Sequence, residues 1–127
     1  YTTLCNNAPG EILATIAMRN ATDLLQRNHT IVLDNLDLAE KFFKKHKKIL
    51  HWIQPNGGST AFPQLKRPFD VTEMCEKAMN EKELLIIGER AFGLDTNNFR
   101  LGLGRRDFKE ALGVFSEIIE DMEKSVS

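Results

Sequence analysis

The chain of 127 residues has the length of one domain, and its 17 basic and 18 acidic residues leave a net charge of −1. This balance argues against nucleic acid or an anionic membrane as the main partner, and no apolar run approaches the roughly 18 residues needed to span a bilayer. A hydrophobic content of 42% with 28% charged residues is typical of an ordinary soluble globular domain.

The start of the chain and its cysteines bear on its origin and compartment. The sequence opens on Tyr1 and runs at once into a helical pattern, which indicates a piece of a longer protein, and it has no signal-like start. Cys5 and Cys75 are too few for a disulfide framework or a zinc site. We therefore expect reduced thiols and a cytoplasmic protein.

Two helices are predicted in the first part of the chain. Pro9 suits a first helical turn, and apolar residues recur at helical spacing to residue 19. Asn20 and Asp23 then have the spacing of a capping box for a long helix that should end near residue 47. Its apolar stripe is interrupted by two asparagines, one of which is Asn35.

The middle of the chain predicts a hairpin, a helix and a buried strand. Strands are expected at residues 49–55 and 59–66, joined by a Gly-Gly turn. Pro63 removes a ladder donor, so the second strand should bulge there or lie at an edge. A helix capped by Asp70 should follow near 71–80. The apolar run ELLIIGE then predicts a strand buried on both faces.

A fourth strand, NFRLGLG, and a helix over residues 108–124 complete the pattern. Asp107, with Glu110 three residues on, should cap that helix. The order of elements predicts an α+β fold with two layers, in which helices cover one face of a mainly antiparallel sheet of about four strands.

The fourth strand also carries the clearest candidate for chemistry. Side chains alternate along a strand, so its three apolar residues share the core face, whereas Arg100, Gly102 and Gly104 share the other. A guanidinium presents a planar fork that matches a carboxylate, and glycines let a small anion approach closely. The pattern is compatible with a carboxylate clamp and with an ordinary exposed arginine that pairs with an acidic neighbour.

Other motifs favour structural roles. The histidines include His29 and His46, and neither has a serine or cysteine partner by motif, so each is interpreted as a surface or partly buried residue. The lysine-rich run at residues 44–48 fits a helix C-terminus, where cations complement the helix dipole. GLGRR lacks the spacing of a phosphate-binding loop.

Three segments together resemble the C-terminal part of class I/II pyridoxal-phosphate-dependent aminotransferases of fold type I: HWIQPNGGSTAFPQLK, ELLIIGERAFG and NNFRLGLGRRDFKEALGVFSEII. That family has a Pro-x-Gly-Gly stretch before a strand, matched by Pro55, Gly57 and Gly58, and a Phe-Arg-Leu-Gly strand before its final helix. The resemblance implies that residues 1–20 form a crossover helix from a missing large domain and that residues 21–127 form the small C-terminal domain.

The resemblance also implies roles. Arg100 would bind the substrate carboxylate in a bidentate pair, and Gly57, Gly58 and Gly102 are possible site-lining residues. The parent would be a homodimer that uses pyridoxal phosphate to transfer an amino group between an amino acid and a 2-oxo acid. One departure is Ile87, which precedes Gly88 where the family usually carries proline.

No segment matches the family's cofactor lysine or its phosphate-binding residues, which belong to the large domain. We therefore expect this fragment to contain no catalytic residue, to bind neither cofactor nor metal, and to be inactive alone. Nucleic acid and membrane are not expected as partners. The first helix should expose apolar surface, through which the fragment could self-associate.

Two alternatives stay open. The chain could be a free-standing α+β binding or interaction module without catalysis. It could also be the same small domain from a pyridoxal-phosphate-dependent acyltransferase, decarboxylase or lyase. The sequence does not specify the amino-acid substrate.

Overall fold

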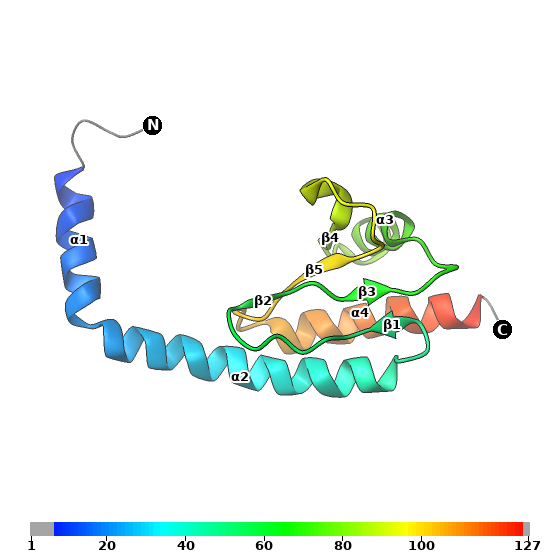
Figure 1. The fold of residues 1–127 in the computed structure, drawn as a ribbon, viewed down its shortest axis with the longest axis horizontal. Helices are drawn as coiled ribbons and strands as arrows, with labels where there is room; N and C mark the ends of the chain where they lie inside the picture. The colour runs from blue at the N-terminus through cyan, green and yellow to red at the C-terminus, as the bar shows by residue number, and fades with distance from the viewer. Residues whose placement is uncertain (1–6, 126–127) are drawn as a thin grey trace. The chain divides into compact units, whose positions relative to one another are not determined.

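A computed structural model describes residues 7–125 of the chain (Figure 1). The chain divides into two units, residues 1–30 and 31–127, which are described separately. The described elements are, in order, α1 (Ala8–Arg19), α2 (Ala21–Lys45), β1 (Leu50–His51), β2 (Thr60–Ala61), β3 (Gln64–Leu65), α3 (Val71–Lys82), β4 (Ile87–Gly88), the 3-10 helix η1 (Glu89–Phe92), β5 (Phe99–Gly102) and α4 (Phe108–Lys124).

The first unit holds α1 and the beginning of α2. Every residue of α1 is exposed, and Ile12, Leu13 and Ile16 are each more than half exposed. The predicted capping box at the start of α2 is wrong. The Asn20 side-chain amide donates to the Ile16 carbonyl at 2.8 Å, so this residue satisfies a carbonyl at the end of α1 and not an N–H group of α2.

The second unit confirms the α+β class. β5 is the central strand of a three-stranded antiparallel sheet, with β2 on one side and β4 on the other. β1 and β3 form a second small antiparallel sheet. The described strands therefore number five short ones in two sheets, where the sequence predicted about four in one.

The strand expected at residues 59–66 is divided at Pro63. β2, before the proline, pairs with β5, whereas β3, after it, pairs with β1. The simple hairpin between residues 49–55 and 59–66 is therefore only partly formed. Because proline has no N–H to donate, the division falls at a residue that could not take a full place in a ladder.

The strand predicted to be buried on both faces is also corrected. Only Ile87–Gly88 of ELLIIGE is a strand, and Leu85 is 70% exposed. Helices pack on one face of this sheet and leave the other face open, so an apolar run beside it cannot be covered on both sides.

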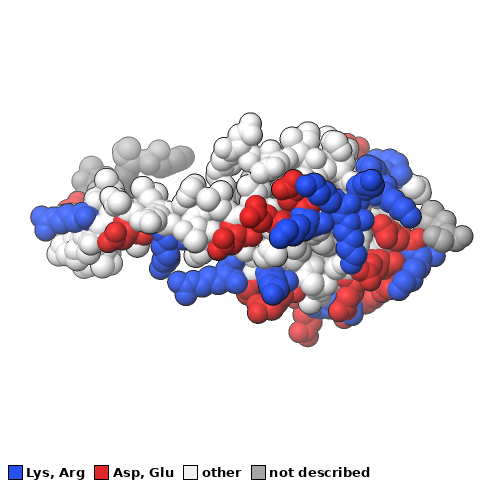
Figure 2. All heavy atoms as spheres, turned by 90° about the horizontal axis from the view of Figure 1, so that it is seen from below, with Lys and Arg blue, Asp and Glu red and all other residues white. Residues whose placement is uncertain are grey.

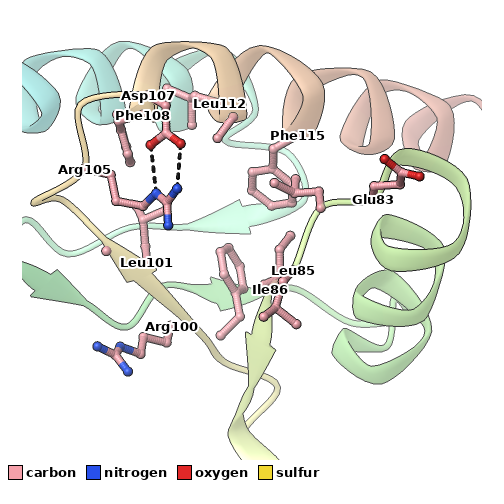
Figure 3. Close-up of a pocket in the computed structure, with 14 residues that line it drawn as sticks. Glu83, Leu85, Ile86, Arg100, Leu101, Arg105, Asp107, Phe108, Leu112 and Phe115 are labelled. Carbon is pink, nitrogen blue, oxygen red and sulfur yellow. Dashed lines mark hydrogen bonds and ion pairs between the residues drawn. The ribbon is translucent and has the colours of Figure 1, made fainter.

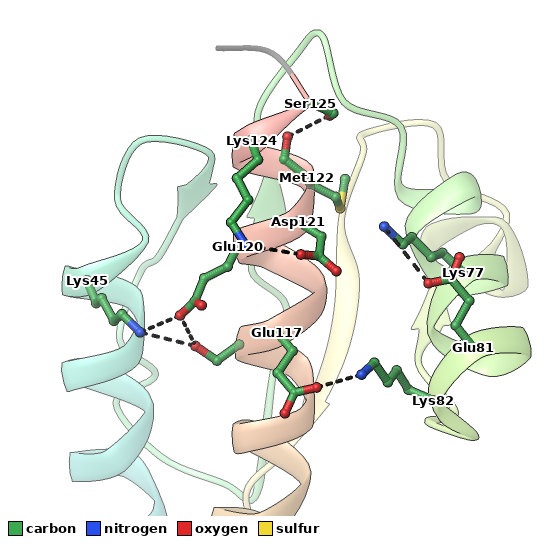
Figure 4. A network of polar contacts seen from close by, with 11 residues as sticks. Lys45, Lys77, Glu81, Lys82, Glu117, Glu120, Asp121, Met122, Lys124 and Ser125 are labelled. Atoms are coloured by element: carbon green, nitrogen blue, oxygen red, sulfur yellow. Dashed lines mark hydrogen bonds and ion pairs between the residues drawn. The ribbon is translucent and has the colours of Figure 1, made fainter.

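The core of the second unit lies between the strands and the helices α2, α3 and α4. α4 lies between α2 and α3 (Figure 4). The largest fully buried side chains are Phe99, Leu65, Met74, Leu103, Ile118, Ile119, His46 and Val71. Such burial contributes roughly 1.5–3 kcal/mol for each large apolar side chain, and this packing holds the sheet against the helices.

Ion pairs join α4 to its two neighbours at the surface. Lys45 on α2 and Lys82 on α3 each approach a glutamate of α4 at 2.6 Å, Glu120 and Glu117 respectively (Figure 4). Figure 2 shows basic and acidic side chains interspersed over the face seen there. Exposed pairs contribute at most about 1 kcal/mol each, so they add little to the apolar packing.

A buried asparagine ties the end of β5 to α2. Asn35, one of the two asparagines that interrupt the apolar stripe, donates from Nδ2 to the carbonyls of Leu103 at 2.8 Å and Arg105 at 2.7 Å. These bonds satisfy two carbonyls where the chain leaves the sheet. The interruption is therefore a buried polar contact that fixes the strand carrying Arg100.

His46 is buried and not at the surface, and it also contacts α4. Its Nε2 lies 3.0 Å from Ser116 Oγ, and its Nδ1 lies 3.8 Å from a Glu123 carboxylate oxygen. Ser116 donates in turn to Glu120 at 3.2 Å. The imidazole is buried among packed side chains. Its contacts with Ser116 and Glu123 therefore form a polar network inside the interface between the end of α2 and α4.

Burial, and then the positive charge of Lys45, lower the pKa of His46 below its usual 6.5, against the opposing effect of Glu123 and Glu120. The unfolded chain therefore takes up this proton first as the pH falls. We expect the free energy of unfolding to fall below about pH 6.5, by at most about 1.4 kcal/mol per pH unit.

Urea unfolding between about pH 7 and pH 5.5 measures this dependence while most carboxylates remain ionised. His46→Gln keeps a polar group near Ser116 and removes the titration, so its stability should change less over this interval. An equal slope in both proteins would show that another group is responsible.

Candidate functional site

Arg100 stands on the open face of the three-stranded sheet. Phe99 and Leu103 are almost fully buried on the core face, whereas Arg100 between them is exposed. The alternation predicted from the sequence is confirmed. No carboxylate within residues 7–125 pairs with Arg100, and no described group forms a hydrogen bond with its guanidinium. The alternative of an arginine paired with an acidic neighbour is therefore not what the described chain contains.

The glycines beside Arg100 leave room above the sheet. A Cβ added at Gly102 would meet no atom within 4 Å, and one added at Gly104 would lie 3.7 Å from Ser59 Cβ. Gly102 shares the face of Arg100, two residues along the same strand. A planar anion that contacts the guanidinium can therefore approach the backbone at Gly102 without displacing a side chain.

Gly57 and Gly58 lie further away, in the turn that leads into β2. Gly58 has φ +80, a left-handed conformation that suits glycine. Thr60 pairs with Gly102, so Gly58 lies two residues beyond that pair and about 13 Å along the sheet from Arg100. The structure thus brings Gly102 to Arg100 and places the Gly-Gly turn at the other end of the strands.

A pocket of about 390 Å³ opens on the helix side of the same sheet, and Arg100 contributes only to its wall. Figure 3 shows the guanidinium of Arg100 directed away from α4 and from this pocket. The pocket is lined by Glu83, Leu84, Leu85, Ile86, Phe99, Arg100, Leu101, Gly102, Arg105, Asp107, Phe108, Ala111, Leu112 and Phe115. Its lining is mainly apolar, so the polar site is the opposite face.

Arg105, a second arginine nearby, is already paired. Its Nε donates to Asp107 Oδ1 at 2.8 Å, and a second nitrogen contacts the other oxygen, so the fork is filled (Figure 3). The hydrogen bonds from Arg105 lower the pKa of Asp107. The predicted cap of α4 by the Asp107 side chain is wrong, because this carboxylate binds the guanidinium two residues earlier. Unlike Arg100, Arg105 therefore has no pair of free guanidinium donors for a ligand.

Asn97 is a supporting residue that sequence analysis missed. It is buried, has φ 60, and lies three residues before Arg100. Its Oδ1 accepts from the Val71 N–H at 2.9 Å, and its Nδ2 donates to the carbonyls of Phe69, at 2.9 Å, and Leu65. Asparagine tolerates the left-handed conformation better than most residues, which is the one local signal available.

Metal and thiol chemistry find no support in the described chain. Within residues 7–125, no cluster of three or more His, Cys, Asp or Glu side chains could hold a metal ion. Burial raises the pKa of Cys75 to about 11, so it stays a protonated thiol and a poor nucleophile. Cys5 lies outside the described residues. No described helix is long and apolar enough to cross a membrane.

Comparisons with known proteins point to one group of enzymes. No protein-family profile matches the chain. Capreomycidine synthase from Streptomyces vinaceus is 27% identical over 119 residues, which are 92% of this chain and 30% of that protein.

Three solved structures have the same fold. A pyridoxal-phosphate-dependent aminotransferase from Streptococcus suis 89-1591 matches all of this chain and 33% of its own, with TM-score 0.83 and 21% identity. The pyridoxal-phosphate-dependent cyclase OrfR matches 95% of this chain and 34% of its own, with TM-score 0.84 and 25% identity. LysN, the α-aminoadipate aminotransferase of Thermus thermophilus, matches 88% of this chain and 30% of its own, with TM-score 0.70 and 13% identity.

The three described strands around Arg100, β2, β4 and β5, carry no lysine that could bind pyridoxal phosphate. The chain spans about a third of the length of the proteins it matches. These similarities confirm the resemblance to pyridoxal-phosphate-dependent enzymes, of which this chain matches a part with the size of a small domain.

Proposed function

We propose that this chain is the small domain of a pyridoxal-phosphate-dependent aminotransferase and that Arg100 binds the carboxylate of its amino-acid and 2-oxo-acid substrates. The observation that carries the proposal is an exposed guanidinium, unpaired within residues 7–125, beside the open backbone of Gly102. The similarity to pyridoxal-phosphate-dependent enzymes supports the parent class. The part of the parent beyond this chain must supply the cofactor lysine.

The proposed role of Arg100 is to position the substrate. Two parallel N–H···O bonds from one guanidinium fix both the place and the plane of a carboxylate. The substrate Cα, one bond away, is then held at a defined point relative to the sheet. Holding a reacting centre in a productive geometry lowers the barrier without a chemical step at the residue that holds it.

A second candidate function keeps the cofactor class and changes the reaction. The two comparison proteins with the higher identities are a synthase and a cyclase, at 27% and 25%, while the two aminotransferases share 21% and 13%. An amino-acid carboxylate would bind Arg100 in either case. Mass spectrometry of the products of the complete enzyme separates them, because only an aminotransferase moves a ¹⁵N label from the amino acid to an added 2-oxo acid.

We further propose that residues 1–20 are the crossover from the large domain of a homodimeric, cytoplasmic parent. The exposed apolar residues of α1 support this, because an isolated domain gains nothing by leaving them in water. Without the large domain, the fragment would self-associate through α1. Light scattering of the 127-residue chain over a range of concentrations tests this, and a monomer throughout would contradict it.

Titration of the 127-residue chain with acetate tests the carboxylate site directly. The Nε–Hε signal of Arg100 in ¹⁵N spectra should shift and saturate at constant ionic strength. Followed on the backbone amide signal of Gly102, Arg100→Gln should weaken acetate binding about threefold to fivefold, because an exposed charge pair contributes at most about 1 kcal/mol.

Arg106→Gln is the matched control. Arg106 is also exposed and removing it changes the net charge equally, so acetate binding should be retained. Equal losses in the two variants, or a shift that never saturates, would indicate general charge attraction and contradict the proposed site.

A further inference from the structure

The register of the sheet places an apolar side chain on each side of Arg100. On the β4 side, Ile87 pairs directly with Arg100. On the β2 side, the ladder continues past the end of the strand, since Leu103 N donates to Ser59 O at 2.7 Å and Phe99 N donates to Pro63 O at 3.0 Å. This register puts Phe62 opposite Arg100.

Burial along the β2 side confirms which face Phe62 occupies. Ala61, Pro63 and Leu65 are buried, whereas Phe62 is exposed, as alternation along an extended chain requires. Phe62 therefore shares the open face with Arg100. Residues directly opposite in antiparallel strands have Cβ atoms about 4.5–5.5 Å apart, so the Phe62 and Arg100 side chains leave the backbone at adjacent points of this face.

Phe62 is held in place by a second aromatic ring. Phe92, at the end of η1, meets Phe62 edge to face, with ring centroids 5.6 Å apart and an interplanar angle of 89°. The two rings remain 38% and 47% exposed. Two exposed phenylalanines that contact one another beside an unpaired guanidinium form an apolar wall next to a positive charge.

We infer that this wall, Phe62 supported by Phe92, determines specificity beside Arg100 and favours organic acids that carry an apolar group near the carboxylate. The inference rests on the proposed function. The guanidinium supplies charge complementarity for the carboxylate, and the open backbone at Gly102 leaves room for it. Apolar atoms of the same ligand then lie against Phe62 and leave water. A carboxylate without such atoms is bound only through its ion pair with Arg100.

The comparison of two ligands isolates the contribution of the wall. Acetate and 3-phenylpropanoate carry the same charge, so the ratio of their affinities for the 127-residue chain, measured on the Arg100 Nε–Hε signal, reports the apolar contact alone. We expect 3-phenylpropanoate to bind about fivefold to tenfold more tightly, the gain that burial of roughly 50 Å² of apolar surface gives.

Phe62→Ala should bring this ratio close to one, and Phe62→Leu should restore part of the preference. Ile53→Ala is the control, because Ile53 is also an exposed apolar residue but lies outside this sheet. It should preserve the ratio. The backbone ¹⁵N spectrum of each variant verifies that it is folded.

The possible failures are distinguishable. If acetate titrates Arg100 but the wild-type ratio is one, or Phe62→Ala leaves the ratio unchanged, the wall has no role in specificity and the carboxylate site stands. If neither acid shifts the Arg100 signal, the proposed function and this inference are both overturned. A preference that survives Arg100→Gln, followed on the backbone amide signal of Gly102, would mean that the phenyl group binds elsewhere.

Discussion

Under the proposed function, replacing Arg100 by glutamine in the complete protein should lower kcat/KM about 100-fold. The substitution removes a bidentate, charge-assisted pair, and a loss near 3 kcal/mol of transition-state stabilisation corresponds to that factor. Arg100→Lys should recover only part of the loss, because an ammonium keeps the charge but cannot present two parallel donors in one plane.

The pattern of kinetic constants distinguishes substrate binding from a general structural defect. KM should rise for the amino acid and for the 2-oxo acid, since both carry the carboxylate. The absorption spectrum of the bound cofactor should be unchanged. An amine substrate without a carboxylate should react equally well with wild type and variant. Arg106→Gln should leave all constants unchanged, and a large loss with the amine would contradict the assigned role.

Local signals in the sequence predicted the helices and the face of Arg100. The cap at Asp70 is confirmed, because its carboxylate accepts from Thr72 N at 2.8 Å and Glu73 N at 3.2 Å. These bonds also lower the pKa of Asp70. The same spacing at Asp107 predicted a cap that does not form. Arg105 competes for that carboxylate, and helix propensities do not describe such competition.

Contacts between distant segments could not be predicted in this way. The division of residues 59–66 between two sheets depends on the pairing partners of β2 and β3. The partner of β3 is β1, which precedes it in the chain, whereas the partner of β2 is β5, which follows it. The position of Phe62 opposite Arg100 depends on that pairing. Strand alternation alone was therefore enough to predict the exposed position of Arg100. The identification of Phe62 as its neighbour required the register of the folded sheet.

Replacing Asn97 by alanine should destabilise the chain by about 4 kcal/mol, the largest effect on stability expected here. The Val71 N–H and the carbonyls of Leu65 and Phe69 would lose their partner, and each buried polar group left unsatisfied costs about 1–3 kcal/mol. Alanine also strains the backbone at φ 60, which costs roughly 1–2 kcal/mol. Urea unfolding measures the difference in the free energy of unfolding, provided that its dependence on urea concentration is the same for both proteins.

Two further substitutions separate the hydrogen bonds from the backbone strain. Asn97→Gly relieves the strain but restores no side-chain bond, so it should be about 1 kcal/mol more stable than Asn97→Ala. Asn97→Asp keeps the acceptor for Val71 N–H and turns an oxygen toward two carbonyls, so it should not recover wild-type stability. Equal stability of the glycine and alanine variants would show that the left-handed backbone contributes nothing. A loss below about 1 kcal/mol for alanine would show that water replaces the amide, and Asn97 would then not hold the entry to the Arg100 strand.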